Sequence, residues 1–281
     1  MTIPDLPALL RLVDDPSPRI SQKVAARLRA LGDEVWNDIE ERALPLSPSQ
    51  RMALQLALAP AEEAGDIEPQ SPEATVRLWS EWRELQSERD EIRYLEGALC
   101  AISSWLRGDF CGERCVYLLD ELAARFRASG EAFDAASLSS FLFETGELRG
   151  ADASQFTQTS NSDLLFTLEE GAGLPITLSC VFILVGARLG IPIEGCNFPG
   201  HFLTRDASEQ SVFDPYNRGR MLSPREVASL RRAAPTEMNE GASARQIIAR
   251  VLRNLSVAFH DSDRAEGANL MLSMLHSLQG N

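Results

Sequence analysis

Three side chains in the second half of the sequence have the types that catalysis by an activated thiol requires. Cys180 lies in the most apolar stretch of the chain, His201 follows a Pro-Gly pair, and Asp214 ends another short apolar run. In such catalysis a histidine takes the proton of the thiol, and a carboxylate orients the imidazole and stabilises its charged form. The order of these residues predicts a His–Asp pair beside the start of a helix that opens at Pro175.

The predicted helix does not begin with a nucleophile. The helix dipole stabilises a thiolate only within the first turn, and that place is taken by Pro175, whose missing N–H suits a first helical position. Cys180 lies further on, among Leu178, Val181 and Phe182. Because burial raises the pKa of a thiol, we expect Cys180 to be a packed core residue, with catalysis by this thiol as the alternative.

Five further polar residues lie near these positions in the sequence. Cys196 ends a predicted strand close to the histidine and is a second candidate thiol. Asn161, Asn197 and Asn217 are candidate binding residues, although a role in forming a turn is the stronger interpretation for Asn197. The hydroxyl of Ser179 is a fourth candidate, and the competing interpretation is that it donates to a backbone carbonyl one turn back.

The elements that would position these residues are one buried helix followed by antiparallel strands. Residues 176–189 are apolar nearly all round, which is typical of a buried central helix. Residues 191–196, 201–204 and 211–214 have the composition of short strands, joined by a turn and a polar hairpin loop. This order predicts an α+β fold and not an alternating βαβ fold.

The N-terminal part of the chain has the pattern of a helical repeat. Residues 6–13 carry a short apolar stripe that ends at an Asp-Pro-Ser-Pro turn. Apolar residues then recur every three or four positions over residues 19–39 and predict one longer amphipathic helix. A short helix, a turn and a longer helix resemble one HEAT-type repeat, which must stack on neighbouring helices to bury its apolar face.

Further helices are predicted on both sides of the α+β core. Residues 73–107, 116–127 and 135–144 have apolar residues at helical spacing, and helices return after the last strand. The chain is therefore divided into residues 1–72, the HEAT-like segment with an acidic linker; residues 73–235, the central domain with its helical lead-in; and residues 236–281, the C-terminal helices.

The composition argues against several classes of function. The formal net charge of −14 opposes binding to nucleic acid, which is itself a polyanion. No apolar run reaches the roughly 20 residues that span a bilayer, and there is no signal-peptide pattern, so no membrane association and a cytoplasmic location are expected. The odd count of five cysteines suits free thiols, and no Cys/His pair follows Cys111 and Cys115, so we expect neither a metal site nor a cofactor.

Several segments together resemble one known family, the SirB-type, transglutaminase-like family. The matching segments are Asn161-Ser162, Gly173-Leu-Pro-Ile-Thr-Leu-Ser179, Ala187-Arg-Leu-Gly-Ile-Pro192, Asn197-Phe-Pro-Gly-His-Phe-Leu203 and Phe213-Asp-Pro-Tyr-Asn217. The segments Tyr94-Leu-Glu-Gly-Ala98 and Phe141-Leu-Phe-Glu144 are similar to its helical lead-in, and Ala249-Arg-Val-Leu-Arg-Asn-Leu255 looks like the start of its tetratricopeptide-like end. The HEAT-like segment lies outside the resemblance.

The resemblance implies a papain-like core with the pair His201 and Asp214. Active transglutaminases carry a cysteine near the position of Pro175, and the family resembled here generally lacks that cysteine. The resemblance therefore predicts a bacterial protein that is a pseudoenzyme. Its transglutaminase-like domain would be non-catalytic or vestigial and would bind a protein or peptide partner. One alternative is a hydrolase or acyltransferase that uses Cys180 with the His–Asp pair. Another is an interaction scaffold in which the flanking helices bind the partner.

Overall fold

The chain, described here from a computed structural model, divides into two compact units, Met1–Asp66 and Ile67–Asn281. The structure describes residues 3–13, 24, 27–28, 30–32, 34–42, 44, 46, 50, 54, 71–145, 148–152, 158–198, 201–208, 210–233 and 241–279. The side chains of Asn37, Glu40, Glu41, His201 and Gln279 lie outside this description. The predicted domain boundaries at residues 72 and 235 stay predictions.

The first unit contains helices α1 (Leu6–Leu12) and α3 (Glu34–Glu41) and has an apolar core of its own. The face predicted for residues 19–39 is buried at Val24, Leu28, Val35 and Ile39, but the prediction of one continuous helix is wrong. Gly32 has a φ of +61° and ends one helical segment just before α3, because this left-handed backbone cannot continue a helix. Residues 14–23 of the predicted repeat lie outside the described residues.

The second unit is built around helix α10 (Pro175–Leu189). Residues 176–186 are all buried, because other elements of the unit surround α10. These elements are α7 (Gly112–Ser129), α9 (Leu164–Glu170), α13 (Ala244–Asp261), β3 (Ile193–Phe198) and β4 (His201–Asp206). The helix ends at Gly190, whose φ of +73° gives the left-handed cap expected of a glycine there. The predicted buried central helix is therefore confirmed.

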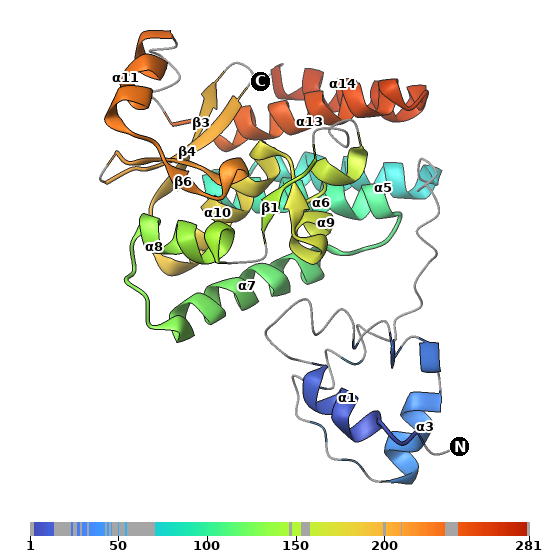
Figure 1. Ribbon diagram of the computed structural model, residues 1–281. Helices are drawn as coiled ribbons and strands as arrows, with labels where there is room; N and C mark the ends of the chain where they lie inside the picture. Colours follow the sequence, from blue (N-terminus) through green and yellow to red (C-terminus); the bar gives the residue numbers. More distant parts are fainter. Residues whose placement is uncertain are drawn as a thin grey trace. The chain divides into compact units, whose positions relative to one another are not determined.

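A four-stranded antiparallel sheet packs against α10, in the order β3-β4-β5-β6 (Figure 1). Its strands are β3 (Ile193–Phe198), β4 (His201–Asp206), β5 (Val212–Asp214) and β6 (Arg220–Met221). The first three strands were predicted within a few residues of these bounds, and β6 was not predicted. In register, Phe198 pairs with His201 and Thr204 pairs with Phe213. The arrangement confirms the α+β fold class.

The two faces of this sheet belong to different apolar clusters. Phe202 and Phe213 join the main core around α10. Residues of the other face form a second cluster, covered by Val227 and Leu230 of helix α11 (Pro224–Ala233). The second cluster consists of Cys196, Phe198, Leu203, Val212 and Leu222. The alternation of side chains along each strand explains why neighbouring residues enter different cores.

Helices and short elements complete the second unit. Before the sheet come α5 (Pro72–Leu85), α6 (Glu91–Arg107), α7 (Gly112–Ser129), α8 (Ala135–Ser139), the π-helix η1 (Ser140–Glu144), β1 (Arg149–Gly150), the 3-10 helix η3 (Thr159–Ser162), α9 (Leu164–Glu170) and β2 (Ala172–Gly173). After β5 comes the 3-10 helix η4 (Pro215–Asn217). The helical structure predicted over residues 73–107 is present as two helices, because Asp90 accepts from the N–H groups of Ile92 and Arg93 and so caps a new helix.

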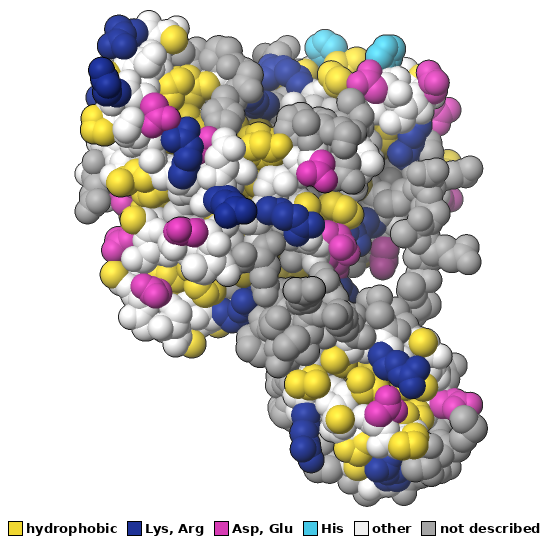
Figure 2. Space-filling model, in the orientation of Figure 1, with side chains coloured by type: hydrophobic (Ala, Val, Ile, Leu, Met, Phe, Trp, Pro, Cys, Tyr) yellow, Lys and Arg dark blue, Asp and Glu magenta, His cyan; other side chains and the backbone are white. Residues whose placement is uncertain are grey.

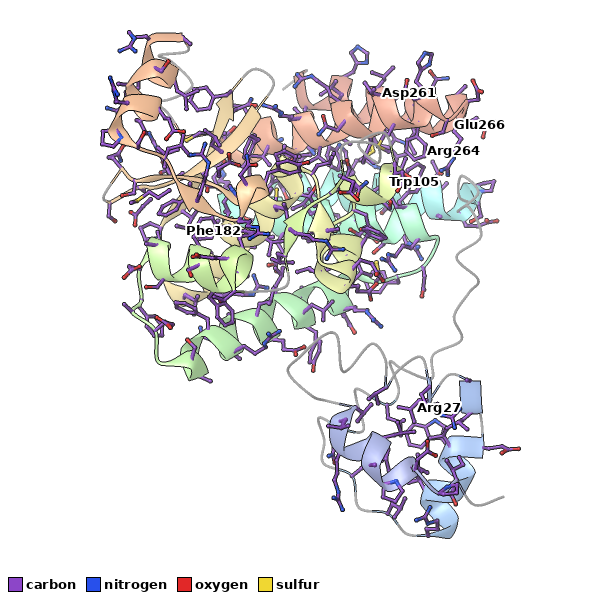
Figure 3. All side chains as sticks on the ribbon, in the orientation of Figure 1. Arg27, Trp105, Phe182, Asp261, Arg264 and Glu266 are labelled. Atoms are coloured by element: carbon purple, nitrogen blue, oxygen red, sulfur yellow. The ribbon has the colours of Figure 1, made fainter. Side chains whose placement is uncertain are left out.

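Helices α13 (Ala244–Asp261) and α14 (Ala265–Gln279) form a hairpin at the C-terminal end (Figure 1). Arg264 stacks on Phe259 at 4.7 Å from its ring centre, and Figure 3 shows Asp261, Arg264 and Glu266 at the turn between the two helices. Phe259 also meets Trp105 of α6 edge-on at 5.6 Å, which ties the hairpin to the main core. None of the helices in the described ranges combines the length and the hydropathy that crossing a bilayer demands.

Candidate functional site

The start of α10 is fixed by a backbone carbonyl and not by a capping side chain. Leu174 precedes the helix with an extended backbone, and Pro175 occupies the first helical position. The N–H of Leu174 and the hydroxyl of Thr177 both donate to the carbonyl oxygen of Asn161, each at 3.0 Å. Asn161 is buried in η3, so this predicted binding residue reaches the helix start through its main chain.

The hydroxyl of Ser179 donates to the carbonyl oxygen of Pro175 at 2.7 Å. From the sequence, a hydrogen bond from this hydroxyl to a backbone carbonyl one turn back was the preferred interpretation over a hydroxyl that faces the cleft, and this is the contact observed. Ser179 is fully buried, and its assignment as a binding residue stays a prediction.

The two candidate thiols are both buried and protonated near neutral pH. Burial raises the pKa of Cys180 to about 12, in agreement with its expected place in the core. Burial also raises the pKa of Cys196 to about 11, although the nearby Arg205 opposes that shift. Cys196 belongs to the apolar cluster under α11, whereas Cys180 belongs to the main core. Neither thiol has the depressed pKa of an activated nucleophile.

Asp214 lies at the junction of β5 and η4, where it is 2 % exposed. Its Oδ1 accepts from the backbone N–H of Asn217 at 3.2 Å, and its Oδ2 accepts from Nδ2 of Asn217 at 2.7 Å. The predicted carboxylate is therefore buried and locally fixed, and the predicted binding residue Asn217 is one of its hydrogen-bond donors.

His201 begins strand β4, directly beside the strand that carries Asp214. The backbone thus places both residues on neighbouring antiparallel strands, as the sequence indicated. The imidazole lies outside the described residues, so its meeting with the carboxylate stays a prediction.

Asn197 lies in strand β3 and not in the turn predicted for it. It pairs in register with Phe202. Its Oδ1 accepts from Nη1 of Arg250 at 2.6 Å, and the same nitrogen donates to the carbonyl of Phe198 at 2.6 Å. The contact with helix α13 explains the difference, because a strand backbone lets this amide reach across to the guanidinium. Its role in binding a ligand stays a prediction.

A surface cleft of about 420 Å³ lies next to Asp214. It is lined by Ala136, Ser140 and Glu144 on one side and by Phe213 and residues 217–221 on the other. We refer to it as the β6 cleft. Sequence reasoning missed it, since a two-residue strand and a π-helix have almost no pattern of their own; the Asn-Arg-Gly turn signal at residue 217 was the available clue.

The β6 cleft is supported from beneath by an aromatic row. Phe182 of α10 lies between Phe143 and Phe213 and is edge-on to both. Its ring centre lies 5.6 Å from that of Phe143 and 5.8 Å from that of Phe213. The hydroxyl of Ser139 donates to the carbonyl of Gly219 at 2.7 Å and joins the two walls. These contacts couple the central helix to the shape of the cleft.

Three more cysteines gather between α6 and the start of α7. Cys100, Cys111 and Cys115 are buried free thiols. The pKa of Cys111 is raised by its hydrogen bond to Cys115 and by burial, and the pKa of Cys115 is raised through its contact with Cys100. Within the described ranges, no three His, Cys, Asp or Glu side chains are grouped so as to hold a metal ion.

Comparison with known proteins places the site in a family context. Residues 113–253 match the family described as the transglutaminase-like superfamily. A UPF0162 protein of Xylella fastidiosa is 33 % identical over 145 residues, which are 47 % of this chain and 51 % of that protein. A UPF0162 protein of Pseudomonas aeruginosa is 32 % identical over 148 residues, 49 % of this chain and 54 % of that protein.

A eukaryotic protein also shares a shorter segment. The human F-box only protein 21 is 31 % identical over 68 residues, which are 21 % of this chain and 11 % of that protein. No solved structure gives a significant match. The chain spans about half the length of the curated UPF0162 relatives it matches.

Proposed function

The chain belongs to the transglutaminase-like superfamily, and from this premise we propose that its domain is non-catalytic or vestigial and binds a segment of a protein or peptide. The observation that carries the proposal is that the start of α10, where a nucleophile would be needed, holds no reactive thiol. Pro175 holds the first position of α10, and the thiol of Cys180 is buried with a pKa raised to about 12.

The surroundings of Asp214 fit a binding role. Its carboxylate is already engaged by the backbone and the side-chain amide of Asn217. A His–Asp pair without a nucleophile still offers donors and acceptors to a ligand. We assign His201 and Asp214 this role, and we assign Asn161, Ser179, Asn197 and Asn217 to the walls and supports of the same site.

The finer family assignment is also part of this proposal. We place the chain in the SirB-type branch, with a HEAT-like N-terminal segment and a tetratricopeptide-like C-terminal end. The α13–α14 hairpin supports the last assignment, because tetratricopeptide units are helix–turn–helix pairs. The five free cysteines support a reducing, cytoplasmic setting.

Peptide binding tests the proposal directly. A library of peptides is screened for saturable binding to the wild-type chain, to His201→Ala and to Asp214→Ala. Weaker binding by either variant, with folding unchanged by circular dichroism, supports a ligand site at this pair. Identical binding by all three proteins counts against it. Turnover of acyl or amide substrates that disappears in Cys180→Ala would establish the enzyme alternative instead.

The scaffold alternative is favoured by one observation, the separate core of the first unit. If the N-terminal helices bind the partner, removal of residues 1–70 abolishes binding while the rest stays folded. Retained binding by the truncated chain removes this alternative and leaves the transglutaminase-like domain as the binding unit.

A further inference from the structure

The β6 cleft has walls of opposite character. One wall is the segment Arg218–Met221, with two guanidinium groups and a methionine that is 59 % exposed. The facing wall is the π-helix η1, where Ser140 donates to Oε2 of Glu144 at 3.0 Å. A ligand here meets positive charge and an apolar surface on one side and a single carboxylate on the other.

The arginines of the first wall can form ion pairs with a partner. Arg218 is exposed, and within the described part of the chain it forms no ion pair. Arg220 pairs with Glu226 at 2.9 Å, but both side chains are about half exposed, and such surface pairs contribute little to stability. Figure 2 shows dark-blue Lys and Arg side chains over the region of α11 and β6, with hydrophobic and acidic side chains between them. This charge contrasts with the net −14 of the whole chain.

The backbone of the same wall is the edge of a sheet. β6 is the last strand in the order β3-β4-β5-β6 and pairs with β5. The N–H of Leu222 donates to the carbonyl of Val212 at 2.8 Å. Because backbone groups alternate in direction along an antiparallel strand, those of Met221 point away from β5. An extended chain can therefore add to this edge, which is a common mode of peptide recognition.

We propose that the β6 cleft binds an extended, acidic peptide segment of a partner protein. Acidic side chains of the segment pair with Arg218 and Arg220, an apolar side chain packs on Met221, and the main chain pairs along β6. This inference rests on the proposed binding function and specifies the chemical class of the partner. A nucleic acid fits less well, since Phe213 in the cleft is only 2 % exposed and offers no face for base stacking.

The proposal is tested with a fluorescein-labelled, N-acetylated octapeptide of four Glu-Val repeats. Fluorescence anisotropy measures its binding to the full chain and to the double variant Arg218→Gln, Arg220→Gln. We expect the double variant to bind at least about ten-fold more weakly, because two charge-assisted contacts are lost. We also expect weaker binding at high salt.

The matched control removes two other exposed arginines, with Arg89→Gln and Arg93→Gln near the start of α6. This variant has the same net charge as the first, and we expect its affinity to stay within about two-fold of wild type. Equal losses in both variants would show non-specific attraction and overturn the proposal. Displacement of the peptide by a single-stranded RNA octamer, with the same dependence on Arg218 and Arg220, would overturn the peptide class.

A second peptide separates this inference from the function on which it rests. An octapeptide of four Gln-Val repeats that binds as tightly as the acidic one, and loses nothing in the Arg218 and Arg220 variant, overturns the acidic preference but leaves the binding function intact. Substrate turnover that depends on Cys180 overturns the non-catalytic function, whether or not the acidic peptide binds.

Discussion

Asn217 donates two hydrogen bonds to the carboxylate of Asp214, one from its backbone at 3.2 Å and one from its side chain at 2.7 Å. These hydrogen bonds fix the bend between β5 and η4. They thereby position residues 217–221, which line one wall of the β6 cleft. Removing the hydrogen-bond donors of a buried carboxylate costs free energy. The charge has already lost its hydration in the interior, and without donors nothing compensates for that loss.

Asn217→Ala is expected to lower the free energy of unfolding by about 1.5–3 kcal/mol, since it removes one hydrogen bond to a charged group. Asn217→Asp keeps the size of the side chain but places a second carboxylate beside Asp214, so it should destabilise more at pH 7 than Ala does. Urea unfolding monitored by circular dichroism measures both. An Asp variant as stable as wild type contradicts the contact.

The thiol of Cys180 makes stability depend on pH in a defined direction. Its pKa in the folded chain is about 12, above the value of about 8.5 for an exposed thiol. The folded state therefore holds its proton more tightly, so this contribution is fully present below about pH 8.5 and is lost as pH rises toward 12. Between those limits, wild type should lose up to about 1.4 kcal/mol per pH unit more than Cys180→Ala.

Labelling gives an independent measure of the same thiol. Burial raises the pKa of Cys180 far above pH 8, so this thiol stays protonated at that pH, whereas about a quarter of ordinary thiols are ionised. Iodoacetamide should leave Cys180 unmodified in the native chain and modify it in 6 M guanidinium, as read by peptide mass spectrometry. Rapid native labelling at pH 6 would instead indicate an activated nucleophile and favour the hydrolase or acyltransferase alternative.

The sequence predicted those parts of the fold in which local pattern and burial agree. The run from Ile176 to Leu189 is apolar all round and became the central helix, and three of the four strands of the sheet follow from short apolar runs between turns. Asp214 and His201 fall on adjacent strands for the same reason. Here periodicity and tertiary packing favour the same structure.

The features that were missed depend on contacts far apart in sequence or on single residues. The amide of Asn197 lies in a strand because Arg250, 53 residues later, reaches it across the sheet. The helix predicted over residues 73–107 is divided by the cap at Asp90, which outweighs the apolar periodicity around it. The β6 cleft forms between segments about 80 residues apart, as shown by Ser139 and Gly219, and no local pattern encodes such a meeting.

Arg250→Met is expected to loosen the contact between α13 and the sheet. Its guanidinium donates to Asn197 and to the carbonyl of Phe198, each at 2.6 Å, and lies 5.5 Å above the ring of Phe202. Loss of these hydrogen bonds should cost about 2–3 kcal/mol and speed amide hydrogen exchange in β3 and β4.

The matched control for Arg250 lies one turn along the same helix. Arg253 is exposed on α13, so Arg253→Met removes the same charge without the contacts to the sheet. It should change the free energy of unfolding by no more than about 0.5 kcal/mol. Equal destabilisation by the two variants would mean that the charge of α13, and not its contact with β3, matters for stability.

Gly219→Ala tests whether the walls of the β6 cleft are held together as tightly as the structure indicates. Gly219 has a φ of +67°, and a Cβ at this position would press on Oγ of Ser139 and lie 2.8 Å from Cδ2 of Phe143. Gly130 has a φ of +78° with open space around it, so Gly130→Ala carries the backbone strain alone, about 1–2 kcal/mol. We expect Gly219→Ala to destabilise the chain by at least about 1 kcal/mol more than Gly130→Ala in urea unfolding, because overpacking adds to the strain. The excess should shrink in a Ser139→Ala, Phe143→Ala background, because Oγ of Ser139 and the ring of Phe143 are removed and only the Cβ of residue 143, at 3.0 Å, still meets the new methyl group. If the excess persists in full there, the walls are not held by these contacts.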